Sequence, residues 1–182
     1  RAGTRAGLAY LPPSRARGGA LLSGTVTENI TMSVLPRYFR HGRIDTAAER
    51  SSPARLIEAL HVRPGDPAAP MSAPSDGNQQ KVLFAKLEHS GAQILVLHEP
   101  TNGVDVGARE QVLAAARALK DQGWSLLSIS KVYVDLEAIC DGVLVFGDGR
   151  VRADLFGDSI EEKAIATACL NATAESGAER AA

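Results

Sequence analysis

The pattern of apolar and polar positions changes near residue 90. Residues 8–11 form a short apolar run that a proline pair stops, and the segment 25–89 has mainly helical patterns broken by loops. Beyond it, strand-like and helix-like segments alternate. The expected strands are 94–97, 125–129 and 143–146, and the expected helices are 105–121, 132–139 and 159–170. This alternation predicts an α/β fold with a mostly parallel sheet, into which the helices of 25–89 are inserted as one unit.

Local signals place the ends of several helices. Thr25 and Glu28 have the spacing of a capping box, which predicts a helix from there to about residue 35. A Ser-Pro step predicts a break within the helical pattern of 45–60. Ser75 is a candidate N-cap for a helix over about 77–88.

The remaining segments carry simpler signals. Ile94–Leu97 is an uninterrupted apolar run, the pattern of a strand buried on both faces. Gly147-Asp148-Gly149 predicts the turn of a hairpin. Residues 37–43 are basic and predict a loop, and residues 171–182 are rich in Ala, Glu and Ser, which predicts a frayed, flexible tail.

Composition narrows the class of protein. A net charge of −1 is not that of a nucleic-acid-binding domain, so no nucleic-acid partner is expected. The longest apolar runs are strand-sized and too short to cross a bilayer, and the first residues have no signal-peptide pattern. Cys140 and Cys169 lie in unrelated contexts, which favours a reduced, cytosolic setting over a disulfide framework.

Two segments carry most of the candidate chemistry. Residues 75–81 read Ser-Asp-Gly-Asn-Gln-Gln-Lys, and residues 98–107 read His-Glu-Pro-Thr-Asn-Gly-Val-Asp-Val-Gly directly after a strand. They resemble the signature segment and the Walker B and D-loop segments of ATP-binding-cassette (ABC) ATPases. The Gly-Asn-Gln-Gln-Lys form is similar to that of the second nucleotide-binding domain in bacterial sugar importers of the ribose, xylose and galactose type. The resemblance runs from about Leu8 to about Leu170.

The resemblance implies a partial P-loop NTPase domain of the RecA-like ABC class over residues 1–170. An inserted helical signature subdomain would occupy about 25–89 and the Walker B half 90–158, with the flexible tail over 171–182. The phosphate-binding G-x-x-x-x-G-K-[ST] loop is not on this chain, because none of its five lysines follows a glycine. The chain is therefore expected to be an N-terminally truncated form of the domain with degenerate motifs.

The resemblance assigns nucleotide contacts to the signature residues Ser75, Gly77, Asn78 and Gln79. In the family, this helix start meets the γ-phosphate of ATP held by a partner domain, because free N–H groups and the helix dipole attract anions. Asp76 replaces a glycine of the family motif. Two unit charges about 4 Å apart repel by roughly 4 kcal/mol at an effective dielectric constant of about 20, so Asp76 would weaken this contact. The alternative is that Asp76 simply helps to cap a surface helix.

The Walker B strand of the family ends in Asp-Glu, whereas here it ends in His98-Glu99. Glu99 is the candidate catalytic base that would position or activate the attacking water. His98 takes the place of the aspartate that organises Mg²⁺, although Mg²⁺ prefers oxygen ligands to imidazole. A zinc site would need further ligands at suitable spacing, so no metal site is assigned. The other interpretation of His98 is a strand-end residue with a satisfied hydrogen bond.

Gly103 and Asp105 fall in an intact D-loop, which in the family crosses to the partner domain. Asp105 is also a candidate N-cap of the following helix, and the two roles are compatible. Lys131 falls at the switch position, where the family generally has His and sugar importers often have Ser. Lysine could contact phosphate as a point charge, or it could simply lie solvated at a helix start.

The segment after the first strand corresponds to the Q-loop, which in the family contacts the membrane subunit and helps to order Mg²⁺. Pro13 and Ser14 replace two acidic residues that the family tends to have there, and Arg15 and Arg17 follow. The alternative interpretation of the two arginines is a solvated basic loop.

The implied cofactors are ATP and Mg²⁺, and the implied partners are an ABC membrane permease subunit and another nucleotide-binding domain. The implied location is cytoplasmic, peripheral on the inner face of the bacterial cell membrane. One hypothesis is a truncated or decaying piece of an importer ATPase subunit that is inactive alone. Another is a degenerate, non-hydrolysing cassette domain that acts as an interaction partner. A third, an unrelated α/β domain with fortuitous motifs, also stays open.

Overall fold

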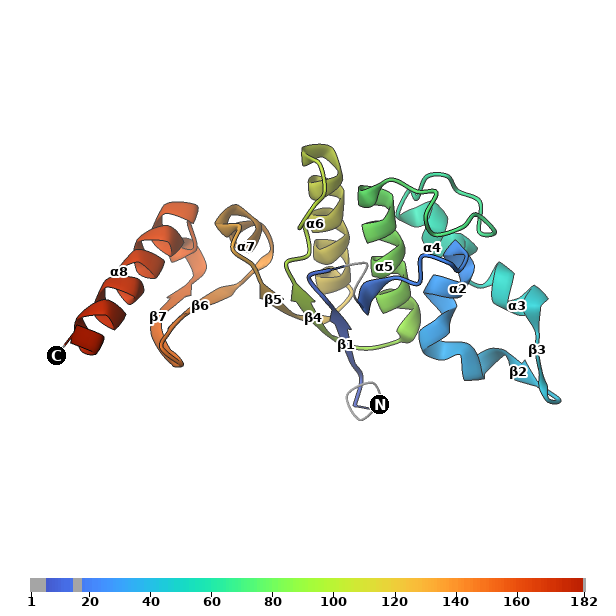
Figure 1. Cartoon of the computed structure of the whole chain (residues 1–182), viewed down its shortest axis with the longest axis horizontal. Coiled ribbons are helices and arrows are strands. Elements are labelled where there is room, and N and C mark those ends of the chain that lie inside the picture. Colours follow the sequence, from blue (N-terminus) through green and yellow to red (C-terminus); the bar gives the residue numbers. More distant parts are fainter. Residues whose placement is uncertain (1–5, 15–17, 182) are drawn as a thin grey trace. The chain divides into compact units, whose positions relative to one another are not determined.

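The computed structural model describes residues 6–14 and 18–181, and the chain divides into two compact units. The first unit ends at Ile129 and contains a parallel sheet and a helical region, while the second begins at Ser130 and contains a hairpin with helices (Figure 1). All the site residues predicted from the sequence, except Lys131, belong to the first unit.

The first unit is built on a three-stranded parallel sheet. β1 (Leu8–Leu11) pairs with β4 (Ile94–His98), and β4 pairs with β5 (Ser125–Ile129), giving the order β1-β4-β5. The predicted strands and their parallel arrangement are confirmed here. The expected strand over 143–146 is not part of this sheet, because it pairs with its sequence neighbour in the second unit.

Two long helices pack on this sheet. α5 (Asp76–Ser90) contacts β1, α6 (Val106–Asp121) contacts β5, and the two helices contact each other. α5 ends at Gly91, whose φ of 72° lies in the left-handed region that glycine adopts without strain. α6 buries the stripe expected from the sequence, namely Val112, Leu113, Ala116 and Leu119.

The two faces of the sheet differ in burial. Paired residues of neighbouring strands share a face. One face, on which α5 and α6 pack, carries Leu11, Leu95 and Leu97, each at most 1% exposed. The opposite face carries large apolar side chains that are exposed to solvent: Tyr10 at 50%, Ile94 at 42%, Leu127 at 57% and Ile129 at 47%. The expectation of a strand buried on both faces is therefore wrong for β4, because the described helices of the first unit pack on only one of them.

A helical region lies between β1 and α5. Its elements are α2 (Val26–Thr31), the 3₁₀ helix η2 (Met32–Tyr38), α3 (Thr46–Ser51) and α4 (Ala54–Ala59). A separate core packs α2 and α4 against α5 and the segment that precedes it. Its buried residues are Val26, Ile30, Ile57, Val62, Ala69, Met71, Val82 and Ala85. The region therefore has buried apolar packing of its own, and its assignment as an inserted subdomain stays a prediction.

The ends of these helices follow the sequence signals. The capping box is present, since the Thr25 hydroxyl accepts from the Glu28 N–H at 3.1 Å and the Glu28 carboxylate accepts from the Thr25 N–H at 2.7 Å. The predicted break in 45–60 is confirmed, because one helix ends at Ser51 and the next begins after Pro53.

Residues 37–43, expected to be a loop, contain part of a short hairpin. β2 (Phe39–Arg40) pairs antiparallel with β3 (Arg43–Ile44). His41, with φ of 49°, and Gly42, with φ of 81°, form its two-residue turn, and two left-handed residues suit the twist of such hairpins. Strands of two residues are too short to show the alternation by which a strand is recognised in a sequence.

The second unit pairs a hairpin with helices. β6 (Gly142–Gly147) and β7 (Arg150–Phe156) are antiparallel, which confirms the predicted turn between them. α8 (Glu162–Ala181) packs against both strands and against α7 (Tyr133–Ile139).

A 3₁₀ turn, η3 (Gly157–Ser159), leads from the hairpin to α8. The flexible tail expected over 171–182 is instead helical as far as Ala181, because a segment rich in alanine has high helix propensity. In the part of the chain that the structure describes, no helix is both long enough and apolar enough to cross a membrane.

Candidate functional site

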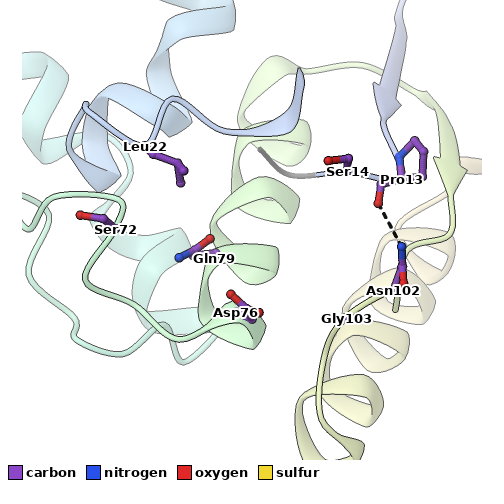
Figure 2. Close-up of a pocket in the computed structure, with 8 residues that line it drawn as sticks. All are labelled: Pro13, Ser14, Leu22, Ser72, Asp76, Gln79, Asn102 and Gly103. Atoms are coloured by element: carbon purple, nitrogen blue, oxygen red, sulfur yellow. Dashed lines mark hydrogen bonds between the residues drawn. The ribbon is translucent and has the colours of Figure 1, made fainter. Parts of the chain in front are cut away.

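The candidate site lies where β1 and β4 end. In a parallel sheet the loops after neighbouring strands meet at the carboxyl edge, which is the usual place of ligand sites in α/β folds. Here a pocket of about 430 Å³ opens between these loops and the start of α5 (Figure 2). Its lining comprises Pro13, Ser14, Leu22, Ser72, Asp76, Gln79, Asn102 and Gly103.

Members of three predicted motifs meet in this pocket. Gln79, from the signature, and Gly103, from the D-loop, both line it, together with Ser14 of the Q-loop region. The Asn102 side-chain amide donates to the carbonyl oxygen of Pro13 at 3.3 Å, which ties the D-loop to the segment after β1. Arg15 and Arg17, the predicted basic residues of the Q-loop, lie outside the described residues.

The turn between β4 and α6 has an unusual backbone. Glu99 has φ of 50°, a left-handed value that is uncommon for residues other than glycine. Its N–H donates to the carbonyl of Ile129 at 2.8 Å, and its carbonyl accepts from the N–H of Asn102 at 3.0 Å. Gly103 is also left-handed, with φ of 70°. The backbone at Glu99 is therefore held from both sides.

Asp105 is the N-cap of α6, as predicted. Its carboxylate accepts from the N–H of Ala108 at 2.9 Å, and its backbone is extended. This bond satisfies one of the free donors at the helix start and is worth about 1 kcal/mol in a typical helix. The structural role expected for Asp105 is thus confirmed, and its D-loop role stays a prediction.

The start of α5 is held by side-chain bonds. Ser75 occupies the N-cap position, but its hydroxyl makes no hydrogen bond to the helix backbone, contrary to expectation. It accepts instead from the Asn78 amide at 2.9 Å, while the Asn78 carbonyl oxygen accepts from the N–H of Arg63 at 2.8 Å. Asn78, assigned to nucleotide contact by resemblance, is therefore engaged within the protein.

Gly77 has a steric reason to be glycine. It is buried, and a Cβ built there would lie 2.3 Å from the Cβ of Ala108, at the start of α6. This distance is far below van der Waals contact. Any side chain at position 77 would force the starts of α5 and α6 apart.

Gln80 is not among the site residues that the motifs predict. It is only 3% exposed, and its amide donates to the carbonyl oxygen of Pro100 at 2.6 Å. This bond joins α5 to the residue that follows Glu99. Helical spacing was the signal that could have identified Gln80. It lies three positions after Gly77 and therefore on the same face of the helix.

The two lysines of α5 point to backbone carbonyls. Lys81 donates to the carbonyl of His61 at 3.0 Å, and Lys86 donates to the carbonyl of Gly19 at 3.0 Å. Burial lowers the pKa of both amines, and nearby Arg63 lowers that of Lys81 further. These lysines stabilise the helical region and leave no free ammonium group on α5 for phosphate.

His98 has a hydrogen-bond partner on the open face of the sheet. Its Nδ1 lies 3.3 Å from the Tyr10 hydroxyl, which agrees with the interpretation of a satisfied strand-end histidine. In the described part of the chain, no group of at least three His, Cys, Asp or Glu residues has the geometry to hold a metal ion. His98 brings nitrogen, and not oxygen, to the Walker B position, so the residues described do not fit a Mg²⁺ site.

Lys131 belongs to the second unit, whereas the other predicted site residues belong to the first. It is exposed and precedes α7, and the N–H of Val132 donates to the Ser130 hydroxyl at 3.0 Å. The phosphate-sensing role of Lys131 stays a prediction.

Curated proteins resemble this chain over most of its length. It is 39% identical over 166 residues to the xylose import ATP-binding protein of Burkholderia ambifaria, which covers 91% of this chain and 32% of that protein. It is 36% identical over 170 residues to the ribose import ATP-binding protein of Chelativorans sp. (strain BNC1), which covers 93% of this chain and 34% of that protein. The chain thus spans about one-third of the length of these relatives. No protein-family model matches it.

Solved structures share the fold at low sequence identity. An ATP-binding cassette of an ABC transporter superposes with a TM-score of 0.73 at 16% identity, over 93% of this chain and 69% of that one. The ATP-binding subunit of another ABC transporter gives a TM-score of 0.64 at 19% identity, with the same coverage. These values support the fold and carry no information on substrates.

Proposed function

Since this chain belongs to the ABC ATPases, we propose that it forms the signature and D-loop side of a nucleotide site in the ATP-binding subunit of a sugar importer. The observation that carries the proposal is the direct contact between α5 and the segment after β4. Gln80 bonds to Pro100, and Gly77 lies against Ala108, so the two motif segments form one continuous edge. Such an edge would keep the signature and the D-loop in a fixed relation to each other when both contact a second nucleotide-binding domain.

In this proposal the start of α5, from Ser75 to Gln79, faces the γ-phosphate of ATP held by that second domain. Gly103 and Asp105 contact the partner through the D-loop, and Glu99 supplies the base toward a bound water. When bound, ATP would supply the phosphoanhydride, and Mg²⁺ would offset the negative charge of its phosphates.

The same proposal covers the partners and the location. The relatives are named as import proteins for xylose and ribose, so we propose a pentose importer, with a membrane permease subunit as partner. The chain would then sit peripherally on the cytoplasmic side of the membrane. Sugar choice would rest with the other subunits.

A pairing experiment tests the proposal. The chain is mixed with the P-loop-containing second nucleotide-binding domain of a xylose importer whose catalytic glutamate has been changed to Gln to block hydrolysis. Sedimentation velocity should detect a heterodimer in ATP that disappears in ADP. Asp76→Gly should tighten pairing at least tenfold, because it removes a negative charge from the phosphate-facing helix start.

A matched pair of variants separates the site from general surface effects. Ser75→Glu should abolish pairing, whereas Ser51→Glu, an equally charged change on the exposed end of α3, should not. The proposal fails if neither the native chain nor Asp76→Gly pairs in ATP, or if Ser75→Glu pairs as well as the native chain.

The second candidate function is that of a non-hydrolysing cassette domain acting as an interaction partner. The observation that favours it is the residue at the Walker B position. His98 stands there in place of an aspartate, and its imidazole is hydrogen-bonded to the Tyr10 hydroxyl. For the chain alone we expect no ATPase activity above background. Turnover that Glu99→Gln abolishes would contradict that expectation. In the heterodimer without the blocking change, turnover above that of the second domain alone supports the first candidate, and ATP-dependent pairing without added turnover supports the second.

A further inference from the structure

The β2–β3 hairpin, Phe39–Ile44, is exposed to solvent along its whole length. All six residues are exposed, with Phe39 at 58% and Ile44 at 37%. The hairpin lies in the helical region, on the side away from the parallel sheet (Figure 1). Phe39 and Ile44 are direct cross-strand partners and so share one face. The hairpin therefore presents an apolar pair that the described residues of its own unit leave partly exposed.

The other face carries a pair of like charges. Arg40 lies directly opposite Arg43, and like charges in that position destabilise a hairpin. Among the described residues, neither guanidinium group makes an ion pair or hydrogen bond. The two nearest carboxylates in sequence are already engaged, since Asp45 caps α3 and Glu49 accepts from the Thr31 hydroxyl. The arginine pair thus lacks a local anion.

We propose that this hairpin is a contact site for an anionic phospholipid surface. Arg40 and Arg43 would each bind lipid phosphates, because a guanidinium group matches phosphate geometry with two parallel hydrogen bonds. The apolar pair would face the headgroup region, and the long arginine side chains would reach back to the phosphate level, as such side chains do at membrane interfaces. Free phosphate or a polyanion in solution would satisfy only the arginines and would leave Phe39 exposed.

The expected strength of the membrane contact suits a role in orienting the chain at the membrane. Each arginine close to an anionic bilayer raises partitioning about fivefold, so the pair gives about 25-fold. A gain of about 25-fold is weak for recruiting the chain to a membrane by itself. If the chain is already attached at another point, the hairpin has a high effective concentration at the lipid surface, and the weak contact then strengthens the attachment. The inference goes beyond the function proposed above and does not depend on it.

Vesicle flotation tests the inference with the full chain, because bound protein floats while aggregates sink. Vesicles of phosphatidylcholine alone are compared with vesicles of equal parts phosphatidylcholine and phosphatidylglycerol, at low and high salt. We expect partitioning only on the anionic vesicles at low salt. Arg40→Gln with Arg43→Gln should reduce it about 25-fold, and Phe39→Ser should reduce it severalfold.

Matched controls use exposed residues elsewhere. Arg55→Gln with Arg150→Gln makes the same change in charge, and Leu170→Ser removes an apolar side chain that is 72% exposed. Both should float like the native chain, and far-ultraviolet circular dichroism should show that every variant is folded.

Three outcomes would overturn the inference. The first is no flotation of the native chain on anionic vesicles, and the second is equal loss in the hairpin and control variants. The third is full competition by inorganic phosphate or by single-stranded DNA at matched phosphate concentration, because it would assign the hairpin to phosphate groups in solution.

Discussion

The two faces of the parallel sheet come from the same strands and the same kinds of residue, yet the described helices of the first unit pack on only one of them. Leu95 and Leu97 are completely buried, whereas Ile94 and Leu127, on neighbouring positions, are 42% and 57% exposed. An apolar strand therefore indicates that a sheet has an interior, but it does not indicate which faces are covered. Coverage is decided by the helices, and α5 and α6 both lie on the face of Leu11, Leu95 and Leu97.

The sharpest test of this comparison is a pair of truncations on adjacent residues of β4. Leu95→Ala should lower the free energy of unfolding by about 2–5 kcal/mol, because it leaves a cavity under α5 and α6. Ile94→Ala should change it by about 0.5 kcal/mol or less, as exposed substitutions usually do. Urea unfolding followed by circular dichroism measures both, and equal losses would show that the open face is also packed in solution.

The next effect concerns the covering helices themselves. Gly77→Ala should lower the free energy of unfolding by about 1–3 kcal/mol, since the new methyl group would overlap Ala108. Ala108→Gly in the same chain should recover part of that loss, because it removes the atom that is struck. An unchanged urea midpoint for Gly77→Ala alone would mean that the two helix starts are not in contact.

A smaller effect is expected from pH at the far end of α5. The Tyr38 hydroxyl lies 2.6 Å from the His89 Nε2, and burial, with a further contribution from Arg37, lowers the pKa of His89. The unfolded chain then binds more protons than the folded chain just below the ordinary histidine pKa of about 6.5, so stability falls as the pH drops through that value. It levels off once the folded histidine is also protonated.

Unfolding midpoints between about pH 8 and about pH 5 measure this dependence. His89→Gln should remove the part of the slope that is centred below the ordinary histidine pKa, while His41→Gln, on the exposed hairpin, serves as the control. A slope that is unchanged in His89→Gln would contradict the assignment.

The smallest effect on stability, and the largest on solubility, should come from the open face. Leu127→Thr with Ile129→Thr keeps residues that favour strands and should change the free energy of unfolding by about 0.5 kcal/mol or less for each substitution. Large exposed apolar patches promote association, so the variant should bind less of a hydrophobic dye and remain monodisperse at higher concentration. Light scattering that does not change would mean that this face is not the surface through which the chain associates.

Much of the fold was predictable because its signals are local. The capping box at Thr25, the N-cap at Asp105 and the strand over 125–129 depend on residues within a few positions of one another. The β2–β3 hairpin and the open sheet face were missed, because the first is too short for a pattern and the second depends on packing partners.

The site was predictable only as a set of positions. The carboxyl edge of the sheet gathers Gln79 and Gly103, as the motifs suggest. What Gly77 and Asn78 do there depends on Ala108 and Arg63, which are distant in sequence. A motif names the residues, but the contacts across the fold show which of them already have a structural task.

The backbone at Glu99 has a consequence for how mutants at this position should be interpreted. A residue with a side chain in the left-handed region carries a conformational cost on the order of 1 kcal/mol, and such costs persist where the surroundings enforce them. Glycine or asparagine at this position would relieve the cost and should raise the melting temperature, even though the carboxylate is lost. A mutant with a higher melting temperature and a lower activity is the signature of a trade-off between stability and activity. Thermal unfolding of Glu99→Gly beside Glu99→Gln would therefore separate the contribution of the backbone from that of the carboxylate.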